Sequence, residues 1–274
     1  MTSVIVWLDL EKDDLVSGSQ RYFNGGLWIA ADSRISSPSD KFQNGRQILT
    51  DVAPKILPVP YTLYRRHEDG PGSVPVYNGE LGFAYAGNTL PANMTYGLIM
   101  SALAGSTGEF YSEYPTMEDF VKFVTLIGSH FAREAQASFE AFLTGTCPQD
   151  PHGGAQVWHL LLWSQKQGQY HKCEFSAEKR MFLLGNRKAE LREMCRKGFA
   201  LSVDYNPTKA LRAVIKEEGF SEVGGLVTIA KIERQGGITL FPRFGPAAAA
   251  GDLPGSFSRE MLGKIGDFEV GTRT

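Results

Sequence analysis

Thr2-Ser3-Val4-Ile5-Val6-Trp7-Leu8 opens the chain with two small polar residues followed by an uninterrupted apolar run. A second apolar run, Leu27-Trp28-Ile29-Ala30-Ala31, is followed directly by Asp32-Ser33-Arg34. Short runs rich in β-branched and aromatic residues, bounded by polar segments, are typical of buried strands. We expect these two runs to pair as neighbouring strands, joined by a long polar insert over residues 10–26.

Further strand signals follow this pair. Ile56–Val59 and Leu81–Gly87 are apolar, and we expect a strand in each. Between them, Pro60–Asn78 carries several Gly, Pro and charged residues and is predicted to be an exposed loop. Ile35–Leu49 is predicted to be a second polar insert, because it is rich in Ser, Asp, Gln and Gly.

Two helices are expected in the middle of the chain. The first covers Leu90–Ala104. The second begins at Thr116, whose side chain can cap a helix while Asp119 reaches back three residues later. Its apolar residues recur at helical spacing, as in Phe120, Val124, Ile127 and Phe131.

The last third of the chain alternates strands and helices, which favours two antiparallel sheets with helices on both outer faces. We therefore predict an α+β fold, with one domain over residues 1–244 and an extended or mobile C-terminal tail over 245–274. The expected elements are strands at Val157–Trp163, Tyr170–Phe175 and Met181–Leu184, helices at Lys188–Arg196 and from Asn206-Pro207 to Gly219, and a hairpin of Leu226–Ile232 with Ile238–Phe241.

The composition narrows the functional class. A net charge of −2 and a pI near 6.2 give no electrostatic reason to bind nucleic acid or an anionic membrane. No signal peptide or membrane-spanning apolar run is evident, so we expect a cytoplasmic protein. Three widely separated cysteines (Cys147, Cys173 and Cys195) favour a reducing compartment. The five histidines have no metal-site spacing, so we expect surface or partly buried imidazoles, no metal and no cofactor.

Thr2 is the first candidate for chemistry. If Met1 is removed, Thr2 carries a free α-amine and a hydroxyl on adjacent carbons. The amine can then act as the base for the hydroxyl, so one residue supplies both parts of a nucleophile. An unperturbed α-amine has a pKa of about 7.7–8.0, which suits a general base near neutral pH.

Together these motifs resemble the proteasome β-subunit family of N-terminal-nucleophile (Ntn) hydrolases. The resemblance lies in Thr2, in Asp32-Ser33-Arg34 after a strand, in Lys55 within an apolar run, and in the small-residue turn at Gly87 before a helix. It is strongest to simple bacterial members such as Anbu or the peptidase of the two-component ATP-dependent protease. It implies a four-layer αββα sandwich, here with polar loop insertions and a C-terminal tail.

The resemblance also implies a role for each of these residues. Thr2 is expected to be the nucleophile, and Lys55 to favour the alkoxide and lower the pKa of the amine. Asp32 is expected to pair with Lys55, and Arg34 to position the loop beneath Asp32. Gly87 is expected to offer its backbone N–H to the oxyanion.

The chain departs from the family where other residues orient the amine. The turn Gly185-Asn186-Arg187 stands where the family usually has Gly-Ser-Gly, and Phe220 lies near the usual Asp position. Asn186, Ser221 and Glu222 are the candidates to orient the amine instead. This departure from the family pattern leaves open whether the chain catalyses hydrolysis efficiently, but it does not affect the expected fold.

The resemblance also suggests a substrate pocket and an assembly. Ile35, Ala53, Tyr85 and Thr89 are expected to line the pocket, and Tyr85 to shorten it in favour of small or medium apolar side chains. Family members form closed oligomers, so we expect a homo-oligomer in a ring or helical ring-like assembly. The apolar helix pair over residues 90–131 either forms that interface or only covers a sheet. Peptides or unfolded proteins would be substrates, and an ATP-driven unfoldase is a candidate partner.

Two other functions remain open from the sequence. The first is a non-catalytic proteasome-like scaffold or binding subunit, which the altered turn at Gly185-Asn186 favours. The second is an Ntn amidase acting on a small-molecule amide, with the inserts 10–26 and 60–79 shaping its pocket.

Overall fold

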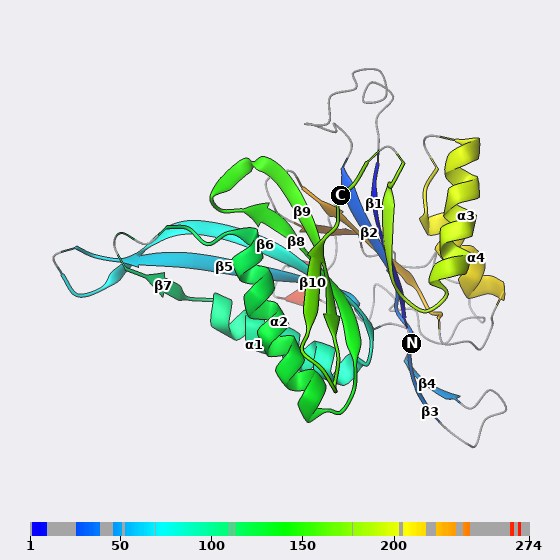
Figure 1. Cartoon of the computed structure of the whole chain (residues 1–274), viewed down its shortest axis with the longest axis horizontal. Coiled ribbons are helices and arrows are strands. Elements are labelled where there is room, and N and C mark those ends of the chain that lie inside the picture. Colours follow the sequence, from blue (N-terminus) through cyan, green and yellow to red (C-terminus); the bar gives the residue numbers. More distant parts are fainter. Residues whose placement is uncertain are drawn as a thin grey trace.

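In the computed structural model the N-terminal run is a fully buried strand, drawn in dark blue in Figure 1. The structure describes residues 2–9, 26–38, 46–50, 53–68, 70–109, 111, 113–176, 178–202, 205–217, 223–233, 238–241, 264–265 and 268–269. Within these residues, no helix is both long enough and apolar enough to cross a membrane.

The N-terminal strand lies in the interior of a five-stranded antiparallel sheet of order β11-β1-β2-β12-β13. Val4 of β1 pairs with Ala31 of β2 on one side and with Leu184 of β11 on the other. The predicted pairing of the first two runs is confirmed. The strands are β1 (Ser3–Leu8), β2 (Leu27–Asp32), β11 (Met181–Gly185), β12 (Val227–Ile232) and β13 (Ile238–Phe241).

A second sheet has six strands in the order β10-β9-β8-β6-β5-β7. Its strands are antiparallel except for β7, which pairs parallel to β5. They are β5 (Ile56–Arg66), β6 (Ser73–Gly87), β7 (Ser106–Gly108), β8 (Phe139–Cys147), β9 (Asp150–Leu162) and β10 (Gln169–Lys172).

The prediction of a loop over Pro60–Asn78 is wrong, because most of this segment belongs to the long β5–β6 hairpin. Its aromatic residues explain the difference. Tyr61 is buried, stacks with Tyr77 and contacts Phe120 of the helix α2 (Met117–Glu134). Gly79 accommodates this packing, since a Cβ atom there would lie 2.4 Å from the Tyr61 ring. Cross-strand aromatic packing therefore outweighs the local turn signals.

The expected polar insert at Ile35–Leu49 is partly strand. β3 (Ile35–Pro38) and β4 (Arg46–Thr50) pair as a separate two-stranded hairpin. Most of the C-terminal tail over residues 245–274, which was expected to be extended or mobile, lies outside the described residues. Its described part is the short pair β14 (Lys264–Ile265) and β15 (Phe268–Glu269).

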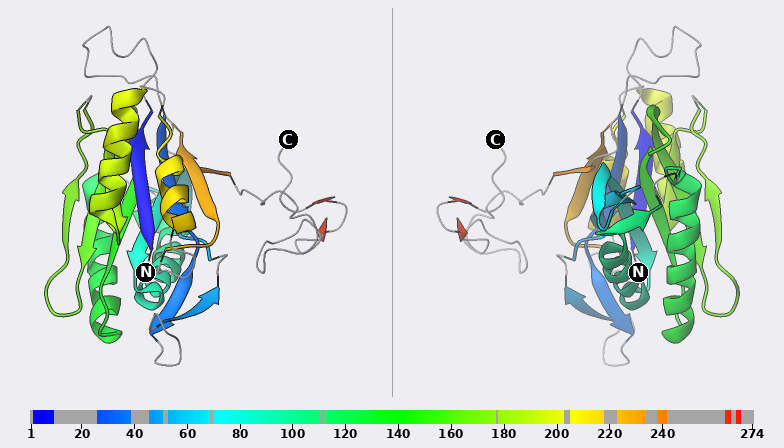
Figure 2. Two further views of the ribbon diagram at one scale, coloured as in Figure 1. Left: turned by 90° about the vertical axis from the view of Figure 1, so that its right-hand side faces the viewer. Right: turned by 90° about the vertical axis from the view of Figure 1, so that its left-hand side faces the viewer.

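Two pairs of helices pack against the two sheets (Figures 1 and 2). α1 (Thr89–Leu103) and α2 (Met117–Glu134) cover the second sheet. α3 (Lys188–Leu201) and α4 (Thr208–Glu217) cover the first. The predicted capping box at Thr116 is confirmed, because its hydroxyl accepts from the Asp119 N–H while the Asp119 carboxylate accepts from the Thr116 N–H.

Three apolar clusters follow from this packing. One joins α1 and α2 to the second sheet, and another joins α3 and α4 to the first sheet. The third includes Val4, Ile29, Ala84 and Phe142 and so combines inward-facing residues of both sheets. The two sheets therefore face each other, and the start of β1 lies beside the end of β6.

Candidate active site

Backbone hydrogen bonds on both sides fix the start of the N-terminal strand. The carbonyl of Thr2 accepts from the backbone N–H of Asn186, at 3.1 Å, in the turn that follows β11. The N–H of the next residue, Ser3, donates to Oδ1 of Asp32 at 2.8 Å. Thr2 is thus held between the end of β11 and the end of β2.

The Thr2 side chain is fully buried, with 0% exposure. Its hydroxyl has no hydrogen-bond partner among the residues that the structure describes. Buried polar side-chain atoms are nearly always partnered, and the exceptions need an explanation such as a role in catalysis. The backbone hydrogen bonds of Thr2 and Ser3 fix the position of the residue that carries this hydroxyl.

Asp32 is the buried acid of the site and accepts several backbone hydrogen bonds. Besides Ser3, the N–H groups of Gly224 and Arg34 donate to its Oδ2, at 3.2 and 3.4 Å. Burial raises the pKa of Asp32 to about 6, although these bonds and the charge of Lys55 pull it downward. Near neutral pH the group is an ionised carboxylate, and both of its oxygens accept hydrogen bonds from the backbone.

Lys55 is the buried cation of the site, with 1% exposure. Its Nζ donates to Oγ1 of Thr89 at 3.3 Å and lies 5.0 Å from the centre of the Tyr85 ring. Burial lowers its pKa to about 8, and the charge of Asp32 opposes that change. The two residues predicted to form an ion pair are thus electrostatically coupled. Lys55 donates its hydrogen bond to Thr89, and no hydrogen bond joins it to the Thr2 hydroxyl.

Arg34 supports the loop after β2. The backbone N–H groups of Ser33 and Arg34 both donate to the carbonyl of Gly224, at 3.2 and 3.1 Å. The guanidinium packs over Gly224 so closely that a Cβ atom there would lie 2.2 Å from Cζ of Arg34. Arg34 therefore contacts the segment that donates to Asp32, as a loop-positioning role requires.

Glycines with positive φ angles end the strands β6 and β11. Gly87, at the end of β6, has a φ of +106°, and a Cβ atom there would lie 3.0 Å from Cα of Phe139. Gly185, at the end of β11, has a φ of +82°. A Cβ atom on it would lie 1.7 Å from the Thr2 carbonyl oxygen and 3.0 Å from Cβ of Ala86. Both positions need glycine, and Gly185 lies against both Thr2 and Ala86, the residue before Gly87.

The candidates to orient the amine are only partly described. Asn186 contacts the N-terminal strand through its backbone, since its N–H donates to Thr2 and its carbonyl accepts from Oγ of Ser3 at 2.7 Å. Ser221 and Glu222 lie outside the described residues.

The four expected pocket residues fall into two groups. Tyr85 and Thr89 lie with Lys55, and burial raises the pKa of Tyr85 to about 12. Ile35 and Ala53 are half-buried beside the Asp32–Arg34 loop, and the N–H of Ala53 donates to the Ser33 carbonyl at 2.9 Å.

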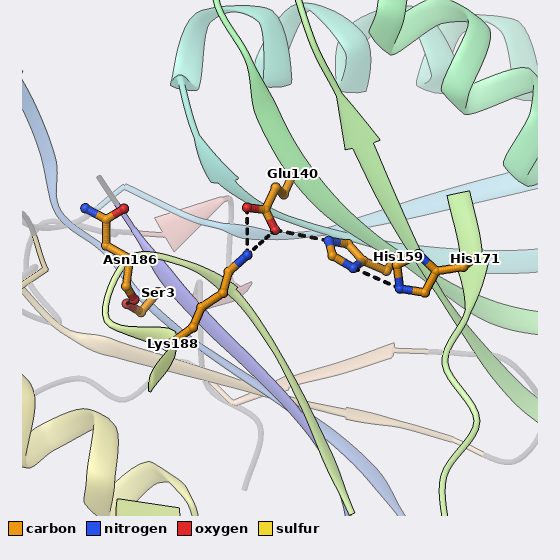
Figure 3. A network of polar contacts seen from close by, with 6 residues as sticks. All are labelled: Ser3, Glu140, His159, His171, Asn186 and Lys188. Carbon is orange, nitrogen blue, oxygen red and sulfur yellow. Dashed lines mark hydrogen bonds and ion pairs between the residues drawn. The ribbon is translucent and has the colours of Figure 1, made fainter. Parts of the chain in front are cut away.

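The sequence did not reveal a second polar cluster, formed by Glu140, His159, His171 and Lys188 (Figure 3). Lys188 and His159 both contact the carboxylate of Glu140, and His159 also contacts His171. The four residues come from β8, β9, β10 and the start of α3, so no short spacing links them. The sequence did predict that the strands carrying His159 and His171 pair with each other, and in the structure these two residues lie directly opposite.

No described group of three or more His, Cys, Asp or Glu residues has an arrangement suited to a metal ion.

Known proteins match this chain by structure and not by sequence. No family profile and no curated protein sequence matches the chain. Among solved structures, Anbu (ancestral beta-subunit) from Yersinia bercovieri matches with a TM-score of 0.50 and 14% identity, covering 86% of this chain and 82% of that chain. A helical assembly of the Anbu complex from Pseudomonas aeruginosa matches with a TM-score of 0.50 and 14% identity, covering 89% and 88% of the two chains. The predicted resemblance is confirmed for the fold: this chain has the fold of the proteasome-like Anbu proteins.

Proposed function

We propose that this chain is an N-terminal threonine hydrolase that cleaves peptide or other amide bonds through an acyl-threonine intermediate. The observation that carries the proposal is the buried hydroxyl of Thr2, which has no hydrogen-bond partner among the described residues. An unsatisfied buried hydroxyl destabilises a fold by about 1–3 kcal/mol. Thr2 directly precedes Ser3, which binds the buried Asp32, and Asp32 is electrostatically coupled to Lys55, so this setting favours a chemical role.

The chemistry begins once Met1 is removed and the α-amine of Thr2 is free. The amine accepts the hydroxyl proton as Oγ1 attacks the substrate carbonyl carbon, giving a tetrahedral oxyanion. When the C–N bond breaks, the leaving amine takes that proton and an ester to Thr2 remains. Water then attacks the ester, its proton returns through the α-amine, and the carboxylic acid product leaves with Oγ1 restored.

The surrounding residues would stabilise the charges that these steps create. The ammonium of Lys55 favours the alkoxide-like state of Thr2 and lowers the pKa of the nearby amine by like-charge repulsion. Asp32 keeps Lys55 charged and holds Ser3, the residue that follows the nucleophile. The N–H of Gly87 is our candidate donor to the oxyanion, a contribution worth about 2.7–4 kcal/mol in enzymes where it has been measured.

We also propose the finer architecture and pocket that the resemblance implies. The two facing sheets with a helix pair on each would form the four-layer αββα sandwich of the Ntn hydrolases. Tyr85 and Thr89 would form the floor of a short pocket, with Ile35 and Ala53 beside it. Substrates with small or medium apolar side chains would fit best.

Assembly is a further part of the proposal. Leu90, Met94 and Leu98 lie four residues apart on α1, and all three are exposed. This single apolar face favours an interface between copies of the chain, in a ring or helical assembly that encloses the sites. Peptides or unfolded proteins in the cytoplasm would be the substrates, and an ATP-driven unfoldase would deliver them.

One observation favours a non-catalytic subunit as the second candidate. Lys55 donates to Thr89 and has no hydrogen bond to the Thr2 hydroxyl, so the pair is not assembled as in an active nucleophile. In that case the chain would serve as a scaffold with the same fold.

Hydrolysis of a fluorogenic peptide panel tests the two candidates. A threonine hydrolase releases the fluorophore, prefers small apolar residues before the cleaved bond, and loses this activity in Thr2→Val. If wild type and Thr2→Val release fluorophore equally slowly while both assemble normally, the scaffold is supported and the hydrolase is rejected.

A further inference from the structure

A partly buried ionic network lies outside the Asp32–Lys55 centre and reaches the turn that holds Thr2 (Figure 3). Nζ of Lys188 donates to both carboxylate oxygens of Glu140, at 2.8 and 2.6 Å. Nε2 of His159 lies 3.0 Å from the same carboxylate, and Nδ1 of His159 lies 3.2 Å from Nε2 of His171. The network therefore joins three strands of the second sheet to the first residue of α3.

Local structure does not explain why a lysine begins α3. A cation near a helix N-terminus is opposed by the helix dipole. The preceding residue, Arg187, has a φ of +62° in the left-handed region and makes no side-chain capping bond to the helix. Arg187 forms an ion pair with Glu190 within the helix, and the ion pair of Lys188 with Glu140 links this end of the turn to the second sheet.

The other end of the same turn holds the nucleophile. Asn186, two residues before Lys188, donates its N–H to the Thr2 carbonyl and accepts from Oγ of Ser3. Gly185 packs directly on the Thr2 carbonyl oxygen. A displacement of Lys188 is therefore transmitted through two residues to Thr2.

Glu140 lies on the strand that neighbours the proposed oxyanion donor. In the β6–β8 register, Glu140 pairs with Ala86, and Phe139 pairs with Gly87. The Glu140–Lys188 ion pair therefore spans the distance between the strand that carries Gly87 and the turn that carries Thr2.

We propose that Glu140 and Lys188 are positioning residues for the hydrolysis, and that His159 and His171 orient the Glu140 carboxylate. The ion pair holds the turn at Gly185–Lys188, and with it Thr2, at a fixed distance from the N–H of Gly87. This inference rests on the proposed function. Burial opposes ionisation of Glu140, but hydrogen bonds from His159 and Lys188 outweigh it and hold its pKa below the usual value. Small misplacements of reacting groups reduce rates steeply, by up to about 100-fold for 1 Å.

The test compares Glu140→Gln and Lys188→Met with wild type in steady-state hydrolysis of a fluorogenic peptide. We expect kcat to fall about 10- to 100-fold while KM stays within about two-fold, because positioning acts on the reacting atoms rather than on substrate binding. Lys188→Arg keeps the ion pair and should recover most of kcat. Matched controls on the same helix are Glu193→Gln and Lys197→Met, which alter an exposed ion pair and should leave kcat unchanged.

Unchanged kcat in both variants would overturn the proposal, as would equal losses of kcat in Lys188→Met and Lys188→Arg. A second measurement separates failure of this inference from failure of the proposed function. If wild type does not hydrolyse any peptide, hydrogen–deuterium exchange over residues 2–8 and 183–191 decides. Faster exchange in Glu140→Gln and Lys188→Met, but not in the controls, supports the positioning role, and unchanged exchange refutes it.

Discussion

The backbone N–H of Ser3 donates a 2.8 Å hydrogen bond to Oδ1 of Asp32. This bond places a buried carboxylate one residue from the proposed nucleophile, and the same carboxylate is coupled to Lys55. Because β1 and β2 pair antiparallel, the start of one strand and the end of the other meet at this point. The strand register therefore brings the hydroxyl and the acid to one end of the first sheet, and the charge of Asp32 couples them to Lys55, which directly precedes β5 of the second sheet.

Replacing the Thr2 hydroxyl should separate stability from activity. Thr2→Val keeps the shape of the side chain but removes a buried hydroxyl that has no partner among the described residues. We expect peptide hydrolysis to be lost and the free energy of unfolding to stay equal or rise by about 1 kcal/mol. Urea unfolding of both proteins measures the second quantity.

Thr144→Val is the matched control for that change. Thr144 is also fully buried, and its hydroxyl likewise has no hydrogen-bond partner among the described residues. It should show a similar change in stability with hydrolysis intact. Equal loss of hydrolysis in both variants would mean that the Thr2 result reflects the fold and not the chemistry.

The rate should depend on pH through the two buried charges. Burial raises the pKa of Asp32 to about 6 and lowers that of Lys55 to about 8. The proposal needs an ionised Asp32, a neutral Thr2 amine and a protonated Lys55. We therefore expect kcat/KM to fall at low pH, as Asp32 and the amine gain protons, and at high pH, as Lys55 loses one. Lys55→Arg carries a charge that does not titrate in this range, so its residual activity should keep the acid limb and lose the alkaline one. A wild-type profile that is flat from pH 5 to 9 would contradict these roles.

Asp32 should also make stability depend on pH. Its pKa rises on folding from 3.8 to about 6, so the folded state binds this proton more tightly than the unfolded chain. Its contribution to folding is therefore fully present below pH 3.8 and is lost as the pH rises through about 6. The free energy of unfolding of wild type, relative to Asp32→Asn, should fall by about 3 kcal/mol between these limits. Urea titrations at several pH values measure this difference, and a constant difference would refute the assigned shift.

Glycine at position 87 should be required for both backbone conformation and activity. Gly87 has a φ of +106°, and a Cβ atom would lie 3.0 Å from Cα of Phe139. We expect Gly87→Ala to destabilise the fold by at least about 1 kcal/mol and to lower kcat more than it raises KM. Gly97→Ala in α1 is the control, since nothing lies within 4 Å of its Cβ position, and it should stabilise by about 0.5–1 kcal/mol. Normal stability together with normal kcat in Gly87→Ala would contradict the requirement for glycine at this position.

The exposed face of α1 should control assembly. Met94 and Leu98 are 41% and 44% exposed on one face of the helix. Charges introduced by Met94→Glu and Leu98→Glu should dissociate the oligomer, as measured by light scattering, because an apolar interface does not tolerate unpaired charge. Leu201→Glu, at an 89% exposed leucine of α3, should leave the mass unchanged. A monomeric wild type, or an intact assembly in both α1 variants, would contradict the interface.

Patterns confined to a short stretch of sequence predicted much of the fold. The β1–β2 pair, the cap at Thr116 and the hairpin of β12 with β13 each depend on neighbouring residues and are confirmed. β8 was not predicted. It is buried between β6 and β9 and includes Thr144-Gly145-Thr146, so it shows neither an alternating nor a long apolar pattern.

The candidate site was predictable only in part, for a related reason. Asp32 follows one apolar run and Gly87 ends another, so their places at strand ends can be derived from the sequence, whereas Lys55 was placed within an apolar run. The hydrogen bond of Lys55 to Thr89 and the Glu140–Lys188 ion pair depend on side-chain directions and on contacts between distant segments. The spacing of residues along the sequence does not predict such contacts.

The central claim is that Thr2 acts with a free α-amine beside its own hydroxyl. The most direct measurement is intact mass followed by peptide mapping, after treatment with a peptide epoxyketone that reacts with an amine and a hydroxyl together. We expect a chain without Met1 that carries one adduct on Thr2, and no adduct on Thr2→Val. An active preparation that retains Met1, or an adduct that forms at another residue, would contradict it.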